Sequence, residues 1–465
     1  MARIPQDAGL MAALVALLQH FRAAFRQERV FRRVVALLVS EVLALERHTV
    51  TQMLVTLGWV DRDWSAWYRV FRKRRLPYAR LAYRMLQAVL EHVADDELFV
   101  VVGDGTTTPR SSRKMEGVGW LPNPQGAPFQ RGLRLVQRWF HLAWLTPPEE
   151  GYSRAIPLLW LPAFTPKAQR RRHPVRTEGQ AARVALYALR RALRRLGRGS
   201  LRVLFLGDGR YDYLALWRSL PPGVIALVRT AKNRRLYFLP SADQGRRRKY
   251  GDAAPRPQEV WRERRGWRHL TLRVRGRKRH LQVKVLGPVV RRGAPERPLF
   301  LIVVRGKGRR GAPRRQPLAF LVSAAGAPGQ WTLPLPVETL LFWAWQRWEI
   351  EVAHRELKSQ LGLGEKQSWH PEGVVRSVQW SAWVYGVLVL AGYRAWGLTK
   401  GPRPPTRWWQ GGGRWSFNTL WRTYRATWWG GHRFRSDSLE RWLIGEDGSA
   451  LPPSLRGAAL GMARL

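Results

Sequence analysis

The sequence contains no cysteine among its 465 residues. This absence excludes disulfide bonds, zinc sites built on thiolates and catalysis by a thiol, and it is typical of proteins in a reducing cytosol. The ten histidines are scattered along the chain, so no histidine cluster indicates zinc either. If a metal ion takes part in function, carboxylate oxygens are the expected ligands.

Long apolar runs are also missing. Nowhere do about 18 uncharged apolar residues follow one another, which is the length that a spanning helix needs. Residues 9–18 are apolar, but this segment is short, lacks a basic lead-in and is followed by no convincing cleavage site, so it predicts a core helix. Residues 384–393 form a second run that is too short to span. We therefore expect a soluble, cytoplasmic protein that has no membrane partner.

Acidic residues are scarce. The chain has 32 Asp and Glu against 81 Lys and Arg, which gives a formal net charge of +49 and a pI near 11.8. This excess indicates a polyanionic partner, although a coding genome with biased base composition also raises the arginine content. The basic clusters alternate with 25 tryptophans, a mixture suited to phosphate contacts and to stacking on bases. These features favour a nucleic acid as the partner.

Two of the few acids follow apolar, strand-like runs. Residues 98–105 end in Asp104 and a glycine, and residues 201–209 end in Asp208 and a glycine. Both runs predict buried strands, and ligands of open α/β sheets gather beyond the carboxyl ends of such strands. An aspartate at an ordinary junction between strand and turn is the alternative.

A third acid, Glu351, lies in a segment with helical periodicity. Because a helix has about 3.6 residues per turn, Arg347, Glu351, Arg355 and Lys358 fall on one face. A carboxylate framed by cations suits a metal ligand whose neighbours bind phosphate oxygens. The alternative is a solvated helix face with favourable pairs four residues apart. Glu349 and Glu356 are competing acids, and we rank Glu351 first because Glu349 lies off the basic face.

The N-terminal part shows helical periodicity with almost no strand pattern. Residues 49–57, a turn at Gly58 and residues 63–72 have the spacing of a helix-turn-helix unit. The second helix is basic and aromatic, which favours DNA binding; an ordinary pair of antiparallel helices is the alternative. The basic positions expected to contact DNA are Arg69, Arg72 and Lys73.

The order of the elements predicts an α/β fold with a mixed sheet. Strands are expected at 99–104, 133–145 and 155–164, and Thr177 to Gln180 is a capping-box pattern that begins a helix ending near Leu196. The strand before Asp208, a helix near 213–220 and a strand at 224–229 follow. This order is that of a ribonuclease H-like fold. Further strands at 270–274, 281–286, 299–304 and 318–322 predict a mostly β insertion.

Taken together, the chain resembles the DDE-type transposases of bacterial insertion sequences, in particular the insertion-sequence-4-like group. That group has a Tyr-x2-Arg-x3-Glu-x6-Lys signature and a β-strand insertion. Arg347, Glu351 and Lys358 match the signature, whereas the tyrosine position holds Ala344, between two tryptophans. Residues 362–364 and Gln367 also look like the group, and the resemblance covers about 98–380.

The resemblance implies a chemistry. Asp104, Asp208 and Glu351 would hold two Mg²⁺ or Mn²⁺ ions for in-line phosphoryl transfer, and Arg347 and Lys358 would position DNA phosphates. The implied enzyme binds double-stranded DNA, namely the terminal inverted repeats of its element and target DNA. It cuts and joins strands, and it works as a homodimer on paired ends in the bacterial nucleoid. Apart from the resemblance, the position of His354 near Glu351 predicts a contact to phosphate or to a ligand residue rather than metal ligation.

We expect five segments along the chain, and two further functions stay open. The alternatives are a catalytically inactive DNA-binding relative and a ribonuclease H-like nuclease without strand transfer. Tryptophans of the tail (Trp408, Trp409, Trp415, Trp428 and Trp429) could stack on nucleic acid or cover a core. The expected segments are a helical DNA-binding domain at 1–95, a ribonuclease H-like catalytic domain at 96–230 and 331–398, a β-rich insertion at 231–330, and a tail rich in Trp, Arg and Gly at 399–465.

Overall fold

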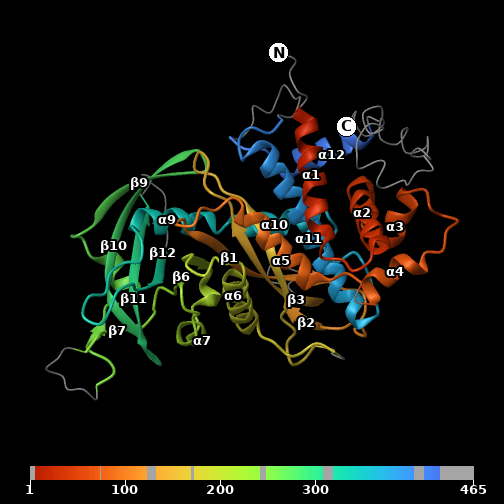
Figure 1. The fold of residues 1–465 in the computed structure, drawn as a ribbon. Coiled ribbons are helices and arrows are strands. Elements are labelled where there is room, and N and C mark those ends of the chain that lie inside the picture. Colours follow the sequence, from red (N-terminus) through yellow and green to blue (C-terminus); the bar gives the residue numbers. More distant parts are fainter. Residues whose placement is uncertain are drawn as a thin grey trace, which may run out of the picture.

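A large mixed β-sheet organises the computed structural model, which describes residues 6–73, 75–122, 132–168, 172–240, 248–306, 318–402 and 413–429 (Figure 1). Its described strands are β1 (Phe99–Pro109), β2 (Val118–Pro122), β3 (Leu133–Leu145), β4 (Ala155–Pro162), β5 (Val203–Gly207), β6 (Val224–Arg229), β7 (Leu236–Phe238), β8 (Ala253–Ala254), β9 (Arg268–Val274), β10 (Arg277–Arg291), β11 (Ala294–Gly306) and β12 (Leu318–Ser323).

The strand order is β2-β3-β1-β5-β6-β12-β11-β10-β7-β8, with β4 paired to β3 and β9 paired to β10. β1 is antiparallel to β3 and parallel to β5, and β5 is parallel to β6. The strands of the expected insertion do not form a separate domain, because β12 pairs antiparallel with β6 and continues the same sheet. The insertion is therefore an extension of the central sheet.

Helices cover this sheet and gather beyond one end of it (Figure 1). In α6 the predicted capping box is present, with Thr177 accepting from the Gln180 amide. Apolar residues 9–18 lie in α1, and the leucines of this run belong to the core, as expected. The described α-helices are α1 (Gln6–Arg22), α2 (Glu28–Leu43), α3 (Val50–Thr56), α4 (Ser65–Arg72), α5 (Tyr78–Leu90), α6 (Glu178–Arg195), α7 (Leu214–Arg218), α8 (Pro257–Arg262), α9 (Val337–Gln346), α10 (Glu349–Ser359), α11 (Pro371–Trp396) and α12 (Phe417–Trp429).

The two faces of the sheet are covered by different helices. Side chains alternate between the faces along a strand, and directly opposed residues of paired strands share a face. His141 of β3, opposite Asp104, contacts His354 of α10. Gly105, the next residue of β1, faces Glu178 of α6 instead. Asp104 therefore points to the α10 face, and α6 packs on the other.

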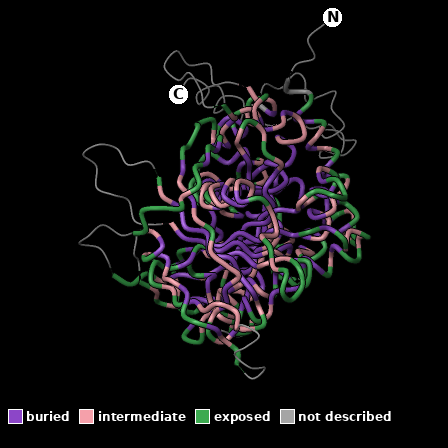
Figure 2. Tube along the Cα trace, turned by 90° about the vertical axis from the view of Figure 1, so that its left-hand side faces the viewer, coloured by how far each residue is buried: buried purple, intermediate pink, exposed green. Residues whose placement is uncertain are grey.

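α11 is the central helix of the core. By length and composition it is able to cross a membrane, but 94% of its apolar window is buried inside the protein. Figure 2 shows buried chain concentrated in the middle of the molecule and exposed chain around it. Tryptophans 380 and 383 of this helix pack against Phe71 and Phe21, so α11 joins the N-terminal helices to the sheet.

Two boundaries differ from the sequence prediction. β1 does not end at Asp104 but runs on to Pro109, because β3 continues to pair with it as far as Val136. The segment 347–358 is not one helix: α9 ends at Gln346 and α10 begins at Glu349. Arg347 and Trp348 keep helical backbone angles between them, so the spacing of four between Arg347 and Glu351 still makes them neighbours.

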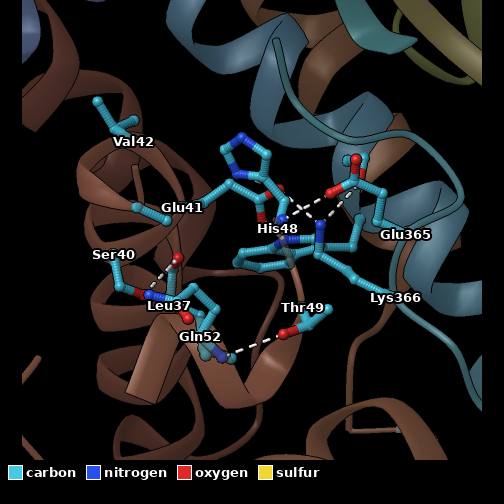
Figure 3. Close-up of polar contacts among 12 residues, drawn as sticks. Leu37, Ser40, Glu41, Val42, His48, Thr49, Gln52, Glu365 and Lys366 are labelled. Carbon is cyan, nitrogen blue, oxygen red and sulfur yellow. Dashed lines mark hydrogen bonds and ion pairs between the residues drawn. The ribbon is translucent and has the colours of Figure 1, made fainter. Parts of the chain in front are cut away.

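A buried polar network fastens α2 to the segment that follows α10 (Figure 3). Lys366 donates to the Glu41 carboxylate at 2.6 Å and to Ser381, and both charged side chains are almost completely buried. The Trp380 indole donates to the other Glu41 oxygen at 2.6 Å. The His48 amide donates to Glu365 at 2.7 Å, so two adjacent residues of one segment bind α2 and the loop that follows it.

Candidate active site

Asp104 and Asp208 lie just beyond the paired part of the parallel strands β1 and β5. The last paired residues of β1 and β5 are Val102 and Leu206, and each aspartate comes two residues later. Asp208 caps the short 3-10 turn Gly209–Tyr211 and accepts from the Arg210 amide at 2.9 Å. Asp104 accepts from the Gly105 amide at 2.8 Å. The register places both carboxylates on the same face of the sheet.

The proximity of the two acids changes the ionisation of Asp104. Burial, and then the negative charge of Asp208, raise the pKa of Asp104 to about 7. Arg347 and the Gly105 amide oppose this increase, and Glu178 adds a little to it. A carboxyl with a pKa this high is typical of functional sites, because two acids at one place favour a shared proton or a cation.

Arg347 lies between this pair and Glu351. It is close enough to Asp104 to lower the pKa of that carboxyl, and its guanidinium donates to Glu351 at 2.5 Å. Glu351 is partly exposed in the first turn of α10. Lys358, on the same helix, interacts with Asp104, while burial lowers its own pKa. Arg355 is exposed to solvent.

The two competing glutamates of α10 are engaged elsewhere. Glu349 is buried between Arg414, at 2.7 Å, and Arg275, at 3.1 Å. Glu356 is buried as well, and it accepts from Arg154 and from the Tyr385 hydroxyl at 2.6 Å. These acids hold the helix in place, whereas Glu351 pairs with the neighbouring Arg347.

His354 does not contact the surface where phosphate would bind. It is buried, and its ring nitrogen lies 3.0 Å from that of His141, whose ring stacks on Trp160. Burial lowers the pKa of His354 to about 3, and it lowers the pKa of His141 as well. Both rings are therefore neutral core residues. This burial contradicts the predicted phosphate contact of His354, while a contact to a ligand residue stays a prediction.

Glu178 is an acid that the sequence prediction did not include. It is the first residue of α6, and its carboxyl lies against Gly105, where an added Cβ would be 2.2 Å from the carboxyl carbon. The buried Tyr211 hydroxyl donates to it at 2.9 Å. The local pattern of residues 177–180 predicts where a helix begins. It contains no information on which strand the first turn of that helix contacts.

The predicted N-terminal DNA contacts lie on the two short helices α3 and α4. A turn with positive φ at Gly58 follows α3, as the spacing predicts. Arg72 and Lys73 are exposed, and Arg69 is partly exposed and bonded to Ser65. Arg69 also lies near Arg33 of α2, whose pKa is lowered by burial and by Arg75, Arg29 and Arg69. α2 and α4 thus share a basic surface.

The tail tryptophans that the structure describes are core residues. Trp415 is buried against Trp396 and the Arg154 guanidinium, and Trp428 is buried against Tyr424. Their proposed stacking on nucleic acid is therefore wrong, and the alternative of core packing is confirmed. Trp408 and Trp409, and the side chain of Trp429, lie outside the described residues.

The arrangement of the three predicted metal ligands only partly suits a divalent ion. Within the described ranges, no group of three or more His, Asp or Glu side chains is close enough together to hold a metal ion. Asp104 and Asp208 nonetheless form a pair of hard oxygen donors, the ligand type that Mg²⁺ prefers. Arg347 holds the third predicted ligand, Glu351. The structure thus brings two of the three predicted ligands together.

Comparison with known proteins identifies the family. The model of the DDE superfamily endonucleases matches residues 16–283, more than half of the chain, so the chain belongs to this family. The match includes both aspartates and Glu178 and ends before Glu351. Members of the family generally use divalent metal ions.

Among solved structures, the chain is similar to a piggyBac transposase synaptic complex with hairpin DNA. The TM-score is 0.40 and the identity 10%, over 94% of this chain and 76% of that chain. A likeness at this level carries no argument about activity. No curated protein matches the chain.

Proposed function

We propose that the chain is a DNA transposase that cuts and joins DNA strands at a metal-dependent site formed by Asp104, Asp208 and Glu351. The observation that carries this proposal is the pair of coupled aspartates facing the cationic side of α10. Family membership supports nuclease chemistry. Nicking and joining both require charge neutralisation at phosphorus, which this combination of acids and cations suits.

Each residue has a role in this proposal. Two Mg²⁺ or Mn²⁺ ions, when bound, supply a nucleophile at neutral pH and charge stabilisation for the leaving oxygen. Asp104, within β1, and Asp208, directly after β5, would hold them. Arg347 and Lys358 hold the phosphates of the transposon end, and Arg355 binds the flanking backbone.

The Arg347–Glu351 ion pair gives this site two states. Without DNA, the guanidinium neutralises Glu351 at 2.5 Å. A DNA phosphate competes for the same guanidinium, because its oxygens accept bidentate hydrogen bonds as a carboxylate does. Release of Glu351 then completes the acid triad. The third ligand is thus made available by substrate binding.

The finer assignment follows the signature on α10. Arg347, Glu351 and Lys358 support a place in the insertion-sequence-4-like group, and the antiparallel β4-β3-β1 with parallel β5 and β6 supports a ribonuclease H-like catalytic unit. We propose a homodimer that pairs two terminal inverted repeats in a bacterial nucleoid. Arg69, Arg72 and Lys73 contact the repeats through the basic surface of α2 and α4.

Strand cleavage and joining on labelled DNA that carries the flanking repeats of the element tests the proposal, with Mg²⁺ or Mn²⁺ added. We expect the native chain to cut and join, and Glu351→Gln to lose at least about 100-fold in rate with DNA binding retained. Glu338→Gln, which changes a partly exposed first-turn glutamate of α9 that also pairs with an arginine, is the matched control and keeps the native rate.

The outcomes separate the alternatives. Cutting without joining favours a nuclease that lacks strand transfer. Binding without cutting in either metal favours an inactive DNA-binding relative. Equal rates for native protein and Glu351→Gln contradict the assignment of this acid.

A further inference from the structure

A pocket of about 480 Å³ lies at the start of α6, on the face of the sheet that this helix covers. Three arginines from different elements line it: Arg138 of β3, Arg183 of α6 and Arg210 of the turn after β5. Arg138 lies opposite Thr107 in the register of β1 and β3, two residues along from Gly105, so it shares the α6 face. The volume is that of an ordinary ligand pocket.

The three guanidinium groups have no partner in the part of the chain that the structure describes. Neither an ion pair nor a side-chain hydrogen bond joins any of them to a described residue. Single arginines are ordinary on a convex surface, where water solvates each charge. Here three of them converge on one concave wall, where like charges repel each other and a bound anion offsets the repulsion.

Glu178 is the one acid among the described residues that line the pocket, and it does not neutralise the arginines. Its carboxylate accepts from the buried Tyr211 hydroxyl at 2.9 Å and lies against Gly105. Tyr213 donates to the Gly179 carbonyl at 2.5 Å, and burial raises the pKa of this phenol to about 12, so it is uncharged at neutral pH. Three arginines against one carboxylate leave two uncompensated positive charges.

The arginine side chains, rather than the helix end, are the donors of this pocket. Thr177 accepts from the Gln180 amide, and the Gln180 side chain accepts from the Thr177 amide in return. The capping box thus already uses amides that an anion at a helix start would bind. Guanidinium donors form a fork that binds two oxygens of one phosphate, so a phosphate is the anion that this wall suits.

Arg210 connects the pocket to the candidate active site. It follows Asp208 by two residues, and its amide donates to the Asp208 carboxylate at 2.9 Å. The pocket wall contains neither Asp104 nor Asp208, so the pocket is a separate subsite and not part of a metal site. A DNA strand that has one phosphate at Asp208 continues with further phosphates on either side of it.

From this geometry we infer that the pocket binds a backbone phosphate of the DNA beyond the one that is cut, with Arg138, Arg183 and Arg210 as its donors. This inference rests on the proposed function, which supplies the DNA, since the arginines alone specify only a phosphate. A free phosphate ion offers the same chemistry, and the experiment separates the two sources.

Binding of labelled duplex DNA that carries the flanking repeats of the element, measured by fluorescence anisotropy in EDTA at several salt concentrations, tests the inference. The pocket variant combines Arg138→Gln with Arg183→Gln and leaves Arg210 unchanged, because Arg210 adjoins Asp208. We expect it to weaken binding by at least about 10-fold. The salt slope should fall by about 0.9, the contribution of one phosphate contact.

Arg191→Gln combined with Arg195→Gln is the matched control, because both arginines are exposed on the same helix and lie outside the pocket. The control removes the same charge and is expected to change the affinity much less. Melting temperatures within a few degrees of the native value establish that each variant is folded.

Replacing single phosphates of the DNA with uncharged methylphosphonates locates the contact. At the position that the pocket binds, this replacement should weaken binding by the native chain and by the control. It should have little further effect on the pocket variant, because the two changes remove the same contact and are therefore not additive.

Equal losses in the pocket variant and the control, or the absence of any DNA position whose effect depends on the pocket arginines, overturn the inference and leave the proposed function intact. Calorimetry with inorganic phosphate separates the sources: binding that the pocket variant loses, with its DNA affinity unchanged, assigns the pocket to a free anion and overturns the inference as well. Failure of the native chain to bind DNA contradicts the proposed function and this inference together. Binding without cutting contradicts the proposed function alone, since the binding assay contains no metal.

Discussion

A carboxylate beside a second carboxylate in a partly buried place resists ionisation, and Asp104 is in this position. Its pKa of about 7 lies far above that of an aspartate in the unfolded chain, because burial and Asp208 disfavour the charged form. The folded protein therefore binds a proton that the unfolded chain has already released. A bound cation would stabilise the ionised form of this carboxyl and so offset the free-energy cost of its charge.

The resulting pH dependence is a first prediction. Since the folded pKa is raised, the unfolding free energy of the metal-free native protein falls as pH rises from about 4 to about 7. Asp104→Asn removes this loss, because an amide does not ionise in this pH range. Its oxygen can still accept from the Gly105 amide. We expect the variant to gain on the order of 3 kcal/mol over the native chain between pH 4 and pH 8.

Chemical denaturation in EDTA at several pH values measures this difference. Net-charge effects are shared by the two proteins and cancel in the comparison. A difference that stays constant between pH 4 and pH 8 would show that Asp104 ionises normally.

A second prediction separates the acids of α10 by their partners. Glu356 is buried and holds Arg154 and Tyr385, whereas Glu351 is partly exposed and holds Arg347 alone. Breaking a buried pair leaves an uncompensated charge, so Glu356→Gln should cost about 3 kcal/mol of stability, and Glu351→Gln less than about 1 kcal/mol. Urea denaturation of both variants checks this order, and equal losses would contradict it.

Local sequence predicts most of the elements but not the contacts between them. Apolar, strand-like runs predict most of the strands but not the short β2, β7 and β8. The pattern Thr177 to Gln180 predicts the start of α6. The continuation of β1 to Pro109 depends on its pairing with β3, which no local pattern contains. For the same reason the strand pattern could predict the pair Asp104 and Asp208, whereas it could not predict the contact of Glu178 with Gly105, which lies 73 positions earlier on another element.

The network that links α2 to the segment after α10 gives a third prediction. Lys366→Met leaves the buried Glu41 without its cation, so the free energy of unfolding should fall by about 3–5 kcal/mol. The double variant Glu41→Gln with Lys366→Met should recover much of this loss, because no uncompensated charge remains. Thermal unfolding of the single and double variants measures the coupling, and additive losses would contradict it.

The whole molecule carries a net charge of +49, and DNA is the polyanion that this charge suits. Negative side chains are too few to balance the cations, so many guanidinium groups remain available on the surface. Part of that surface is shared by α2 and α4, where Arg29, Arg33, Arg69 and Arg75 lie close together. Affinity for DNA should therefore be dominated by the release of counterions and should fall steeply with salt.

The salt dependence can be assigned to one surface, which is the fourth prediction. Each phosphate contact contributes about 0.9 to the slope of the logarithm of the binding constant against the logarithm of salt concentration. Changing Arg69, Arg72 and Lys73 together to Gln should reduce the slope by up to about 2.7 if all three contact phosphate. The two exposed members, Arg72 and Lys73, should account for most of this change, since Arg69 is bonded to Ser65.

As a control, three substitutions on the exposed side of α6, Arg191, Arg194 and Arg195 to Gln, remove the same charge from another helix. A similar loss of slope from both triple variants would mean that DNA senses only the total charge, whereas a loss confined to the α4 variant places the DNA on the N-terminal helices.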